Sequence, residues 1–235
     1  MHAGVRKPVY FYTTEDGEQF PAVDLVVYGM VTMFMIDTSY SSTIVTEEQA
    51  KEWGVLDDLP PDPDDEDSLG CLVIYVEDSH CNTDVYVERV AFNLLGCDFL
   101  MFNCCRLDLD PEHPSLTLRN SSDEDLESYV PKKPVVVAGK EIEAYLDTSE
   151  DSFMTCRRED IEGMSIEISD SFCEWQDFDN ILVSAFGHEA TGTLCVDDVK
   201  NPYLGLQFLR GAVMEFEHDG SVNVFFPSEK KCDVE

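Results

Sequence analysis

The chain has 235 residues, of which 43% are hydrophobic and 11% aromatic, so it can build a sizeable core and is not disordered throughout. It carries 49 acidic against 15 basic residues, a formal net charge of −34. A surface this acidic repels phosphate groups, which argues against direct binding of nucleic acid or docking on an anionic membrane.

The predicted secondary structure is mostly β. Taken in chain order, runs of apolar and β-branched residues predict strands at 23–28, 31–36, 72–76, 85–90, 135–137, 142–146, 166–168, 181–185 and 222–226. Short helices are expected at 46–53, where Thr46 is a candidate N-cap, at 157–162, and within each Leu-Gly-x-x-Phe-Leu motif, at 95–100 and 204–209. We therefore predict an all-β protein with a few short helices, two in each half of the chain.

Two acidic segments that contain prolines interrupt this pattern. Residues 57–67 are predicted to form a solvated loop, whose charge could also hold a basic partner. Residues 121–134 are polar and acidic, and Pro131 and Pro134 stand near their end, which is typical of an exposed linker.

The location of the protein is predicted from its apolar runs and its cysteines. No run approaches the roughly 18 apolar residues of a membrane span, and the first residues lack the apolar stretch of a secretory signal. The nine cysteines are an odd number and include no Cys-x-x-Cys pair. We therefore expect reduced thiols in an intracellular, cytoplasmic protein.

The sequence repeats itself once. Residues 26–39 match residues 136–149, and both segments end in Asp-Thr-Ser, with Asp37 and Asp147 separated by 110 positions. The motif Leu-Gly-x-x-Phe-Leu recurs with almost the same offset. Because the matches keep one order and one spacing, we predict two homologous lobes, residues 1–120 and 135–235, joined by the linker 121–134.

Each lobe resembles a lobe of the aspartic proteases. The resemblance rests on an apolar strand that ends in Asp-Thr, a turn of small residues, a short helix, a hairpin and the closing Leu-Gly-x-x-Phe-Leu. Residues 35–46 look most like the corresponding strand and turn of a retropepsin. The resemblance covers residues 23–118 and 135–226, and it implies a bilobed acid-protease fold in which two retropepsin-like lobes are fused in one chain.

The resemblance also implies a chemistry. Asp37 and Asp147 would face each other as a catalytic dyad that shares one proton and activates a water molecule, and Thr38 and Thr148 would hydrogen-bond across the lobe interface. The substrate would be an extended peptide that adds a strand in the cleft between the lobes, at acidic pH and without a metal or an organic cofactor.

The motifs depart from the family pattern at two adjacent positions in each lobe. The family signature reads Asp-Thr-Gly or Asp-Ser-Gly, whereas here Ser39 and Ser149 stand in place of the glycine. Their hydroxyls could hydrogen-bond the aspartates and change their pKa values, or they could displace the water. Tyr40 and Glu150 replace the usual small residue that follows. The alternative function is therefore an inactive pseudoprotease that holds a peptide or a partner protein, as a scaffold in a protein complex.

Other features are less specific. Candidates for a flap over the dyad are residues 67–70, 76–81 and 186–188. A metal site could be suggested by two groups of residues, His80 and Cys81 with Cys71, or His113 with Cys104 and Cys105. Their spacing is unlike that of zinc ligands, and core thiols with surface histidines explain them better.

Overall fold

The computed structural model describes residues 4–59, 68–77, 81–119, 130–164, 166 and 175–227. Residues 120–129 of the predicted linker region, residues 60–67 of the acidic loop and most of the strand predicted at 166–168 lie outside the described residues.

The first half of the chain forms strands, short α-helices and a 3-10 turn. The strands are β1 (Val5–Thr13), β2 (Gln19–Val27), β3 (Met30–Ile36), β4 (Ile44–Thr46), β5 (Ser68–Val76), β6 (Cys81–Glu88), β7 (Leu94–Leu95), β8 (Arg106–Asp108) and β9 (Ser115–Leu118). The helices are α1 (Glu47–Glu52) and α2 (Cys97–Phe102), and the 3-10 turn is η1 (Leu56–Asp58).

The second half is built of similar elements. Its strands are β10 (Lys132–Val137), β11 (Lys140–Leu146), β12 (Met154–Cys156), β13 (Gln176–Ala185), β14 (His188–Val196), β15 (Tyr203–Leu204), β16 (Val213–Phe216) and β17 (Val222–Phe225). Its helix is α3 (Leu206–Leu209).

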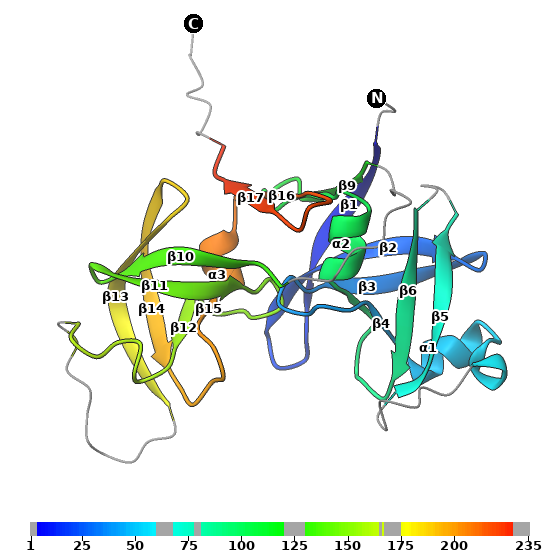
Figure 1. Ribbon diagram of the computed structural model, residues 1–235, viewed down its shortest axis with the longest axis horizontal. Coiled ribbons are helices and arrows are strands. Elements are labelled where there is room, and N and C mark those ends of the chain that lie inside the picture. Colours follow the sequence, from blue (N-terminus) through cyan, green and yellow to red (C-terminus); the bar gives the residue numbers. More distant parts are fainter. Residues whose placement is uncertain are drawn as a thin grey trace, which may run out of the picture.

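The two halves pair their strands in the same way. In the first half β2 and β3 form an antiparallel hairpin, β3 runs parallel to β7, and β4 runs parallel to β6. In the second half the pairs β10–β11, β11–β15 and β12–β14 have the same directions. A short helix then follows, α2 after β7 and α3 after β15 (Figure 1). The predicted fold class, an all-β bilobed acid-protease fold with a few short helices, is confirmed.

Strands from both halves meet in one sheet. Its order is β17-β16-β8-β9-β1-β2-β3-β7-β4-β6-β5, while β10-β11-β15-β12-β14-β13 close into a barrel. The junction is the antiparallel pair β16–β8, where Glu215 accepts hydrogen bonds from Arg106 (2.7 Å) and Arg119 (2.8 Å). Backbone pairing and a shared carboxylate therefore connect the two lobes at this end of the molecule.

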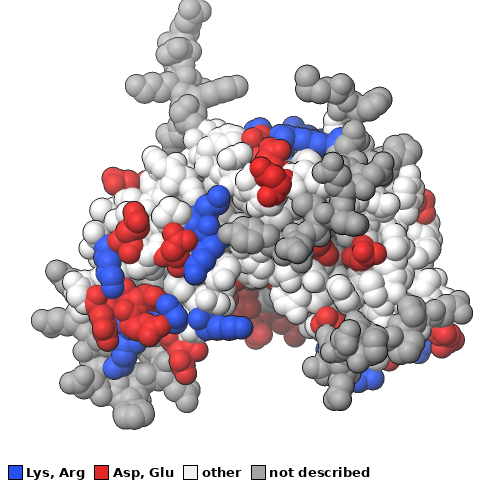
Figure 2. All heavy atoms as spheres, viewed as in Figure 1, with Lys and Arg blue, Asp and Glu red and all other residues white. Residues whose placement is uncertain are grey.

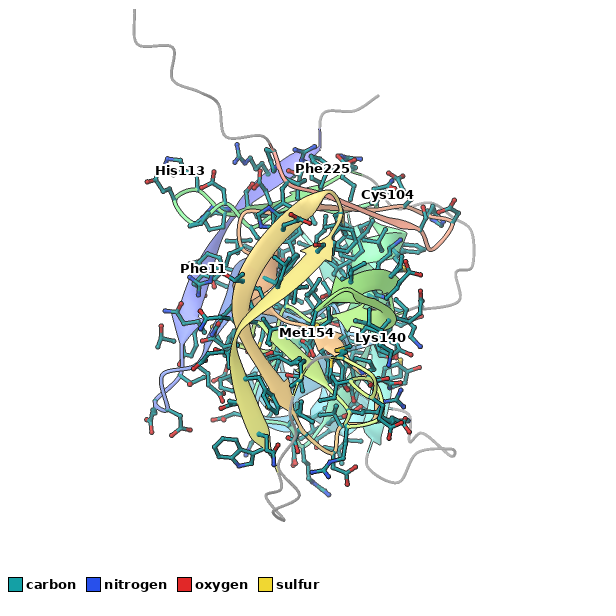
Figure 3. The ribbon with its side chains drawn as sticks, turned by 90° about the vertical axis from the view of Figure 1, so that its left-hand side faces the viewer. Phe11, Cys104, His113, Lys140, Met154 and Phe225 are labelled. Carbon is teal, nitrogen blue, oxygen red and sulfur yellow. The ribbon has the colours of Figure 1, made fainter. Side chains whose placement is uncertain are left out.

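The core lies between the curved layers of each lobe. Alternate residues of β6, at 81, 83, 85 and 87, are buried, as the two-residue period of a strand requires when one face meets the core. In the second lobe β13 and β14 curve across the molecule, and Met154 of β12 lies behind them, fully buried (Figure 3).

The helix predictions were correct for three of the four segments. α1 begins after Thr46, whose hydroxyl accepts a hydrogen bond from the backbone N–H of Gln49 (3.0 Å), as an N-cap does. α2 and α3 both begin within the Leu-Gly-x-x-Phe-Leu motifs, and α2 continues two residues beyond its motif, to Phe102. The helix predicted at 157–162 is wrong, because the segment forms turns with bonds such as Asp160 N to Arg157 O (3.1 Å), and Cys156 stands where α1 has its capping threonine.

Among the strands longer than four residues, the prediction missed β1 and β14 and placed the start of β13 too late. β1 pairs with β2 on one side and with β9 on the other. Its partner β9 lies about a hundred residues away in the sequence, so local pattern alone does not reveal it.

Candidate active site

Equivalent strands deliver the two aspartates. Asp37 follows β3 and its backbone N–H donates to Leu95 O on β7 (3.2 Å). Asp147 follows β11 and donates in the same way to Leu204 O on β15 (3.1 Å). Both residues are buried, with 5% and 6% of their surface exposed. The parallel pairs β3–β7 and β11–β15 thus hold each aspartate at the end of a strand in the centre of the molecule.

Two threonines connect the lobes directly beside the aspartates. Thr38 Oγ1 donates to Leu146 O (2.8 Å), and Thr148 Oγ1 donates to Ile36 O (2.6 Å). Each threonine N–H also donates to the hydroxyl of the other threonine, at 3.2 Å. Both side chains are fully buried. This reciprocal set of hydrogen bonds, which the resemblance implies, fixes the two aspartate-bearing turns against each other.

The serines that replace glycine contact the aspartates. Asp37 Oδ1 accepts hydrogen bonds from Ser39 N (2.9 Å) and Ser39 Oγ (2.8 Å). Asp147 Oδ1 accepts them from Ser149 N (2.9 Å), Ser149 Oγ (2.7 Å) and Glu150 N (3.2 Å). One oxygen of each carboxyl group is therefore surrounded by hydrogen-bond donors.

The two carboxyl groups influence each other electrostatically. Burial raises the pKa of Asp147, and the nearby charge of Asp37 raises it further, while hydrogen bonds from Ser149 and Ser39 act in the opposite direction. Burial likewise raises the pKa of the Cys97 thiol well above its usual value, with Asp37 as the next contribution. A pair of buried carboxyl groups this close titrates as one system.

The surroundings of Asp147 are acidic. Burial raises the pKa of Glu150, and the charges of Asp147, Glu18 and Asp151 add to this effect. Glu18 belongs to the turn between β1 and β2, which lies between the lobes (Figure 1), and the next residue, Gln19, donates its N–H to Asp151 Oδ2 (3.0 Å). Figure 2 shows a hollow between the two lobes with acidic side chains on its inner surface.

The closing motif of each lobe packs against the aspartate turn. A Cβ atom on Gly96 would lie 2.3 Å from Ser42 O, and one on Gly205 would lie 2.3 Å from Ser152 O. Only glycine allows α2 and α3 to start this close to the turns. The two motifs differ at one position, because Asp98 accepts hydrogen bonds from Thr43 N (2.8 Å) and Oγ1 (2.6 Å), whereas the second lobe has a glutamine there.

The described residues do not identify a flap. Residues 68–70 begin β5, and residue 67 lies outside the described part. Of the 76–81 candidate, residues 78–80 lie outside the described part, and Glu77 accepts a hydrogen bond from the N–H of Gly29, next to the end of β3 opposite Asp37. At 186–188 the side chain of His188 stacks on Phe226, with ring centroids 4.0 Å apart, and so faces the C-terminal segment.

The described residues contain neither a metal cluster nor a membrane-spanning helix. Among the described residues, no three His, Cys, Asp or Glu side chains are placed to hold a metal ion. Within the same ranges, none of the helices has the length and apolar character needed to cross a bilayer.

Comparison with known proteins finds likeness in structure rather than in sequence. No protein-family model and no curated protein sequence matches the chain. Among solved structures, a retropepsin-like aspartic protease from Rickettsia conorii is similar, with 19% sequence identity and a TM-score of 0.36. The match covers 49% of this chain and 96% of the other.

Proposed function

We propose that this protein is an aspartic endopeptidase in which Asp37 and Asp147 form the catalytic dyad. The observation that carries the proposal is the meeting of these two buried carboxyl groups at the ends of equivalent strands, held by the reciprocal hydrogen bonds of Thr38 and Thr148. The proposal takes residues 1–120 and 135–235 as the two lobes and residues 121–134 as their linker.

The chemistry follows from the coupling of the two carboxyl groups. At acidic pH one of them is ionised and the other keeps its proton, because two adjacent buried carboxylates repel each other. The ionised group takes a proton from a water molecule, whose oxygen then attacks the peptide carbonyl carbon. The protonated group gives its proton to the carbonyl oxygen. In the second step the C–N bond breaks as the amine nitrogen receives a proton from the dyad.

The substrate class proposed is an extended peptide bound between the lobes. Peptides bind in such a cleft by adding a strand, so that backbone hydrogen bonds supply affinity and side-chain pockets supply specificity. The chemistry requires only the two carboxyl groups and water, and therefore neither a metal nor an organic cofactor.

The test is cleavage of a diverse peptide library from about pH 3.5 to about pH 7, the range in which a shared proton is retained or lost. We expect cleavage by the wild type and loss of cleavage in Asp37→Asn and in Asp147→Asn. Asp179→Asn is the matched control, since it removes an exposed carboxylate on β13 that accepts a hydrogen bond from the Thr193 hydroxyl (2.9 Å). Absence of cleavage by a folded wild type throughout this range would contradict the proposal.

One observation favours a second candidate function, a pseudoprotease that binds a peptide or a partner protein without cutting it. The Ser39 hydroxyl donates to Asp37 (2.8 Å) and also lies close enough to Asp147 to lower its pKa. Its one O–H proton thus occupies an acceptor position of the pair that a catalytic water would otherwise use.

Pepstatin separates the two candidates. A transition-state analogue stabilises the folded protein only where it binds, so a rise in the thermal midpoint at about pH 4 to 5 is expected of a working site. A protein that binds library peptides but is neither stabilised by pepstatin nor cleaves any peptide would be a pseudoprotease.

A further inference from the structure

The hydrogen bonds around the dyad go beyond those that an Asp-Thr-Gly motif could make. A glycine at position 39 or 149 would offer only its N–H. Here each serine adds a hydroxyl that donates to the same oxygen, Oδ1, at 2.8 Å in the first lobe and 2.7 Å in the second. Because the same arrangement occurs in both lobes, it follows from the Asp-Thr-Ser sequence itself.

These bonds decide where a proton can reside. A carboxylate oxygen accepts hydrogen bonds through its lone pairs, and Oδ1 of Asp37 already has two donors, while Oδ1 of Asp147 has three. Protonation of either Oδ1 would force donors to break away. The proton of the dyad is therefore excluded from both Oδ1 atoms and belongs to the Oδ2 atoms.

The same bonds favour the ionised form of the pair. Hydrogen bonds to a charged carboxylate are stronger than those to the neutral acid, so a hydroxyl that donates to Oδ1 lowers the pH at which the group ionises. The Ser39 hydroxyl acts on both carboxyl groups, since it bonds Asp37 and lies near Asp147. It opposes burial and mutual repulsion, which act to keep the pair protonated.

Other titratable groups around the dyad act mainly in the opposite direction. Glu150 lies in the same turn as Asp147, and Glu18 approaches Glu150 from the β1–β2 hairpin. Tyr203 on β15 and Cys97 on α2 are both influenced by the two aspartates. At acidic to neutral pH the tyrosine and the thiol are uncharged, so the two glutamates are the groups that would obscure an effect of the serines.

We propose that Ser39 and Ser149 are positioning residues of the dyad, whose hydroxyls hold the two Oδ1 atoms as acceptors and so make the pair ionise at lower pH than glycine would allow. The inference rests on the proposed function where it concerns cleavage. The hydrogen bonds and the ionisation that they control can be measured without any substrate.

The decisive experiment is a titration of the carboxyl carbons by ¹³C NMR in the full chain, with Asp37→Asn and Asp147→Asn spectra used to assign the dyad. The double variant Ser39→Ala/Ser149→Ala removes both hydroxyls and keeps both Cβ atoms. Loss of a hydrogen bond to a charged group is expected to raise the apparent pKa of the pair by about one unit. The double glycine variant should show a rise of the same size.

The double variant Ser39→Thr/Ser149→Thr is the rescue control, because threonine keeps a hydroxyl at the same place. Its apparent pKa should stay close to that of the wild type. A shift of less than about 0.3 units in the alanine variant would overturn the inference. A shift in the glycine variant alone would also overturn it, because the Cβ atoms rather than the hydroxyls would then control ionisation.

Activity provides the second reading. If the wild type cleaves peptides, the acidic limb of its pH profile should move upward in the alanine and glycine variants by the same amount as the titration. If the wild type cleaves nothing, the endopeptidase proposal fails while the titration still tests the role of the serines. If the alanine variant cleaves peptides and the acidic limb of its pH profile lies at the same pH as in the wild type, the inference is contradicted.

Discussion

The hydrogen bonds between Thr38 and Thr148 lead to a stability prediction that can be worked out bond by bond. Thr38→Val keeps the shape of the side chain but removes the donor to Leu146 O and the acceptor for Thr148 N. Two net hydrogen bonds contribute about 2 kcal/mol, and the two buried backbone groups left without their partner increase the cost. We therefore expect the free energy of unfolding to fall by about 2 to 4 kcal/mol.

The symmetry of the pair supplies an internal check. Thr148→Val removes the other two bonds, to Ile36 O and from Thr38 N, so the two variants share no bond and should destabilise to a similar extent. The measurement is urea unfolding followed by circular dichroism, with Thr191→Val on the exposed face of β14 as a control expected to change stability by less than about 0.5 kcal/mol. Losses below about 1 kcal/mol in both buried variants would refute the view that these bonds join the lobes.

Three further predictions concern the same framework. Gly205→Ala should destabilise by about 3 kcal/mol or more in thermal unfolding, because the new Cβ would lie 2.3 Å from Ser152 O. Asp147→Asn should be more stable than the wild type at neutral pH. Because the pKa of Asp147 is raised in the folded state, the stability of the wild type falls as pH rises from the unfolded-state pKa of 3.8 through the folded-state pKa. The advantage of the variant should therefore vanish in acid, which thermal midpoints measured against pH will show. Glu215→Gln should cost about 0.5 to 1 kcal/mol at low salt, since both of its arginine partners are partly exposed, and the cost should shrink at about 0.5 M NaCl.

Signals that are local in the sequence predicted local structure well. Thr46 caps α1 because a hydroxyl followed by Glu and Gln within one turn is sufficient to start a helix. The segment at 157–162 has a similar composition but follows Cys156, which offers no such acceptor, and it forms turns. The capping residue, rather than the helix propensity of the following residues, separates the two outcomes.

The position of the dyad followed from the repeat, whereas its surroundings did not. Matching Asp-Thr-Ser segments placed Asp37 and Asp147 after equivalent strands, because strand order and spacing are properties of each lobe by itself. The hydrogen bond between Gln19 and Asp151 joins residues 132 positions apart, one from each lobe. No periodicity or repeat reports such a contact, and β1, which carries the hairpin, was missed for the same reason.

The asymmetry of these surroundings bears on how the two carboxyl groups divide their proton. Asp147 has one donor more than Asp37, from Glu150 N, and this additional hydrogen bond favours its ionised form. The charge of Asp147 raises the pKa of Glu150, and since this repulsion is mutual, an ionised Glu150 opposes the ionisation of Asp147. The backbone of residue 150 and its side chain therefore act in opposite directions on one aspartate, and only the side-chain effect can be removed by mutation. In Glu150→Gln the donor remains while the charge is lost, so the pKa of Asp147 should fall, as a ¹³C titration of its carboxyl carbon will show.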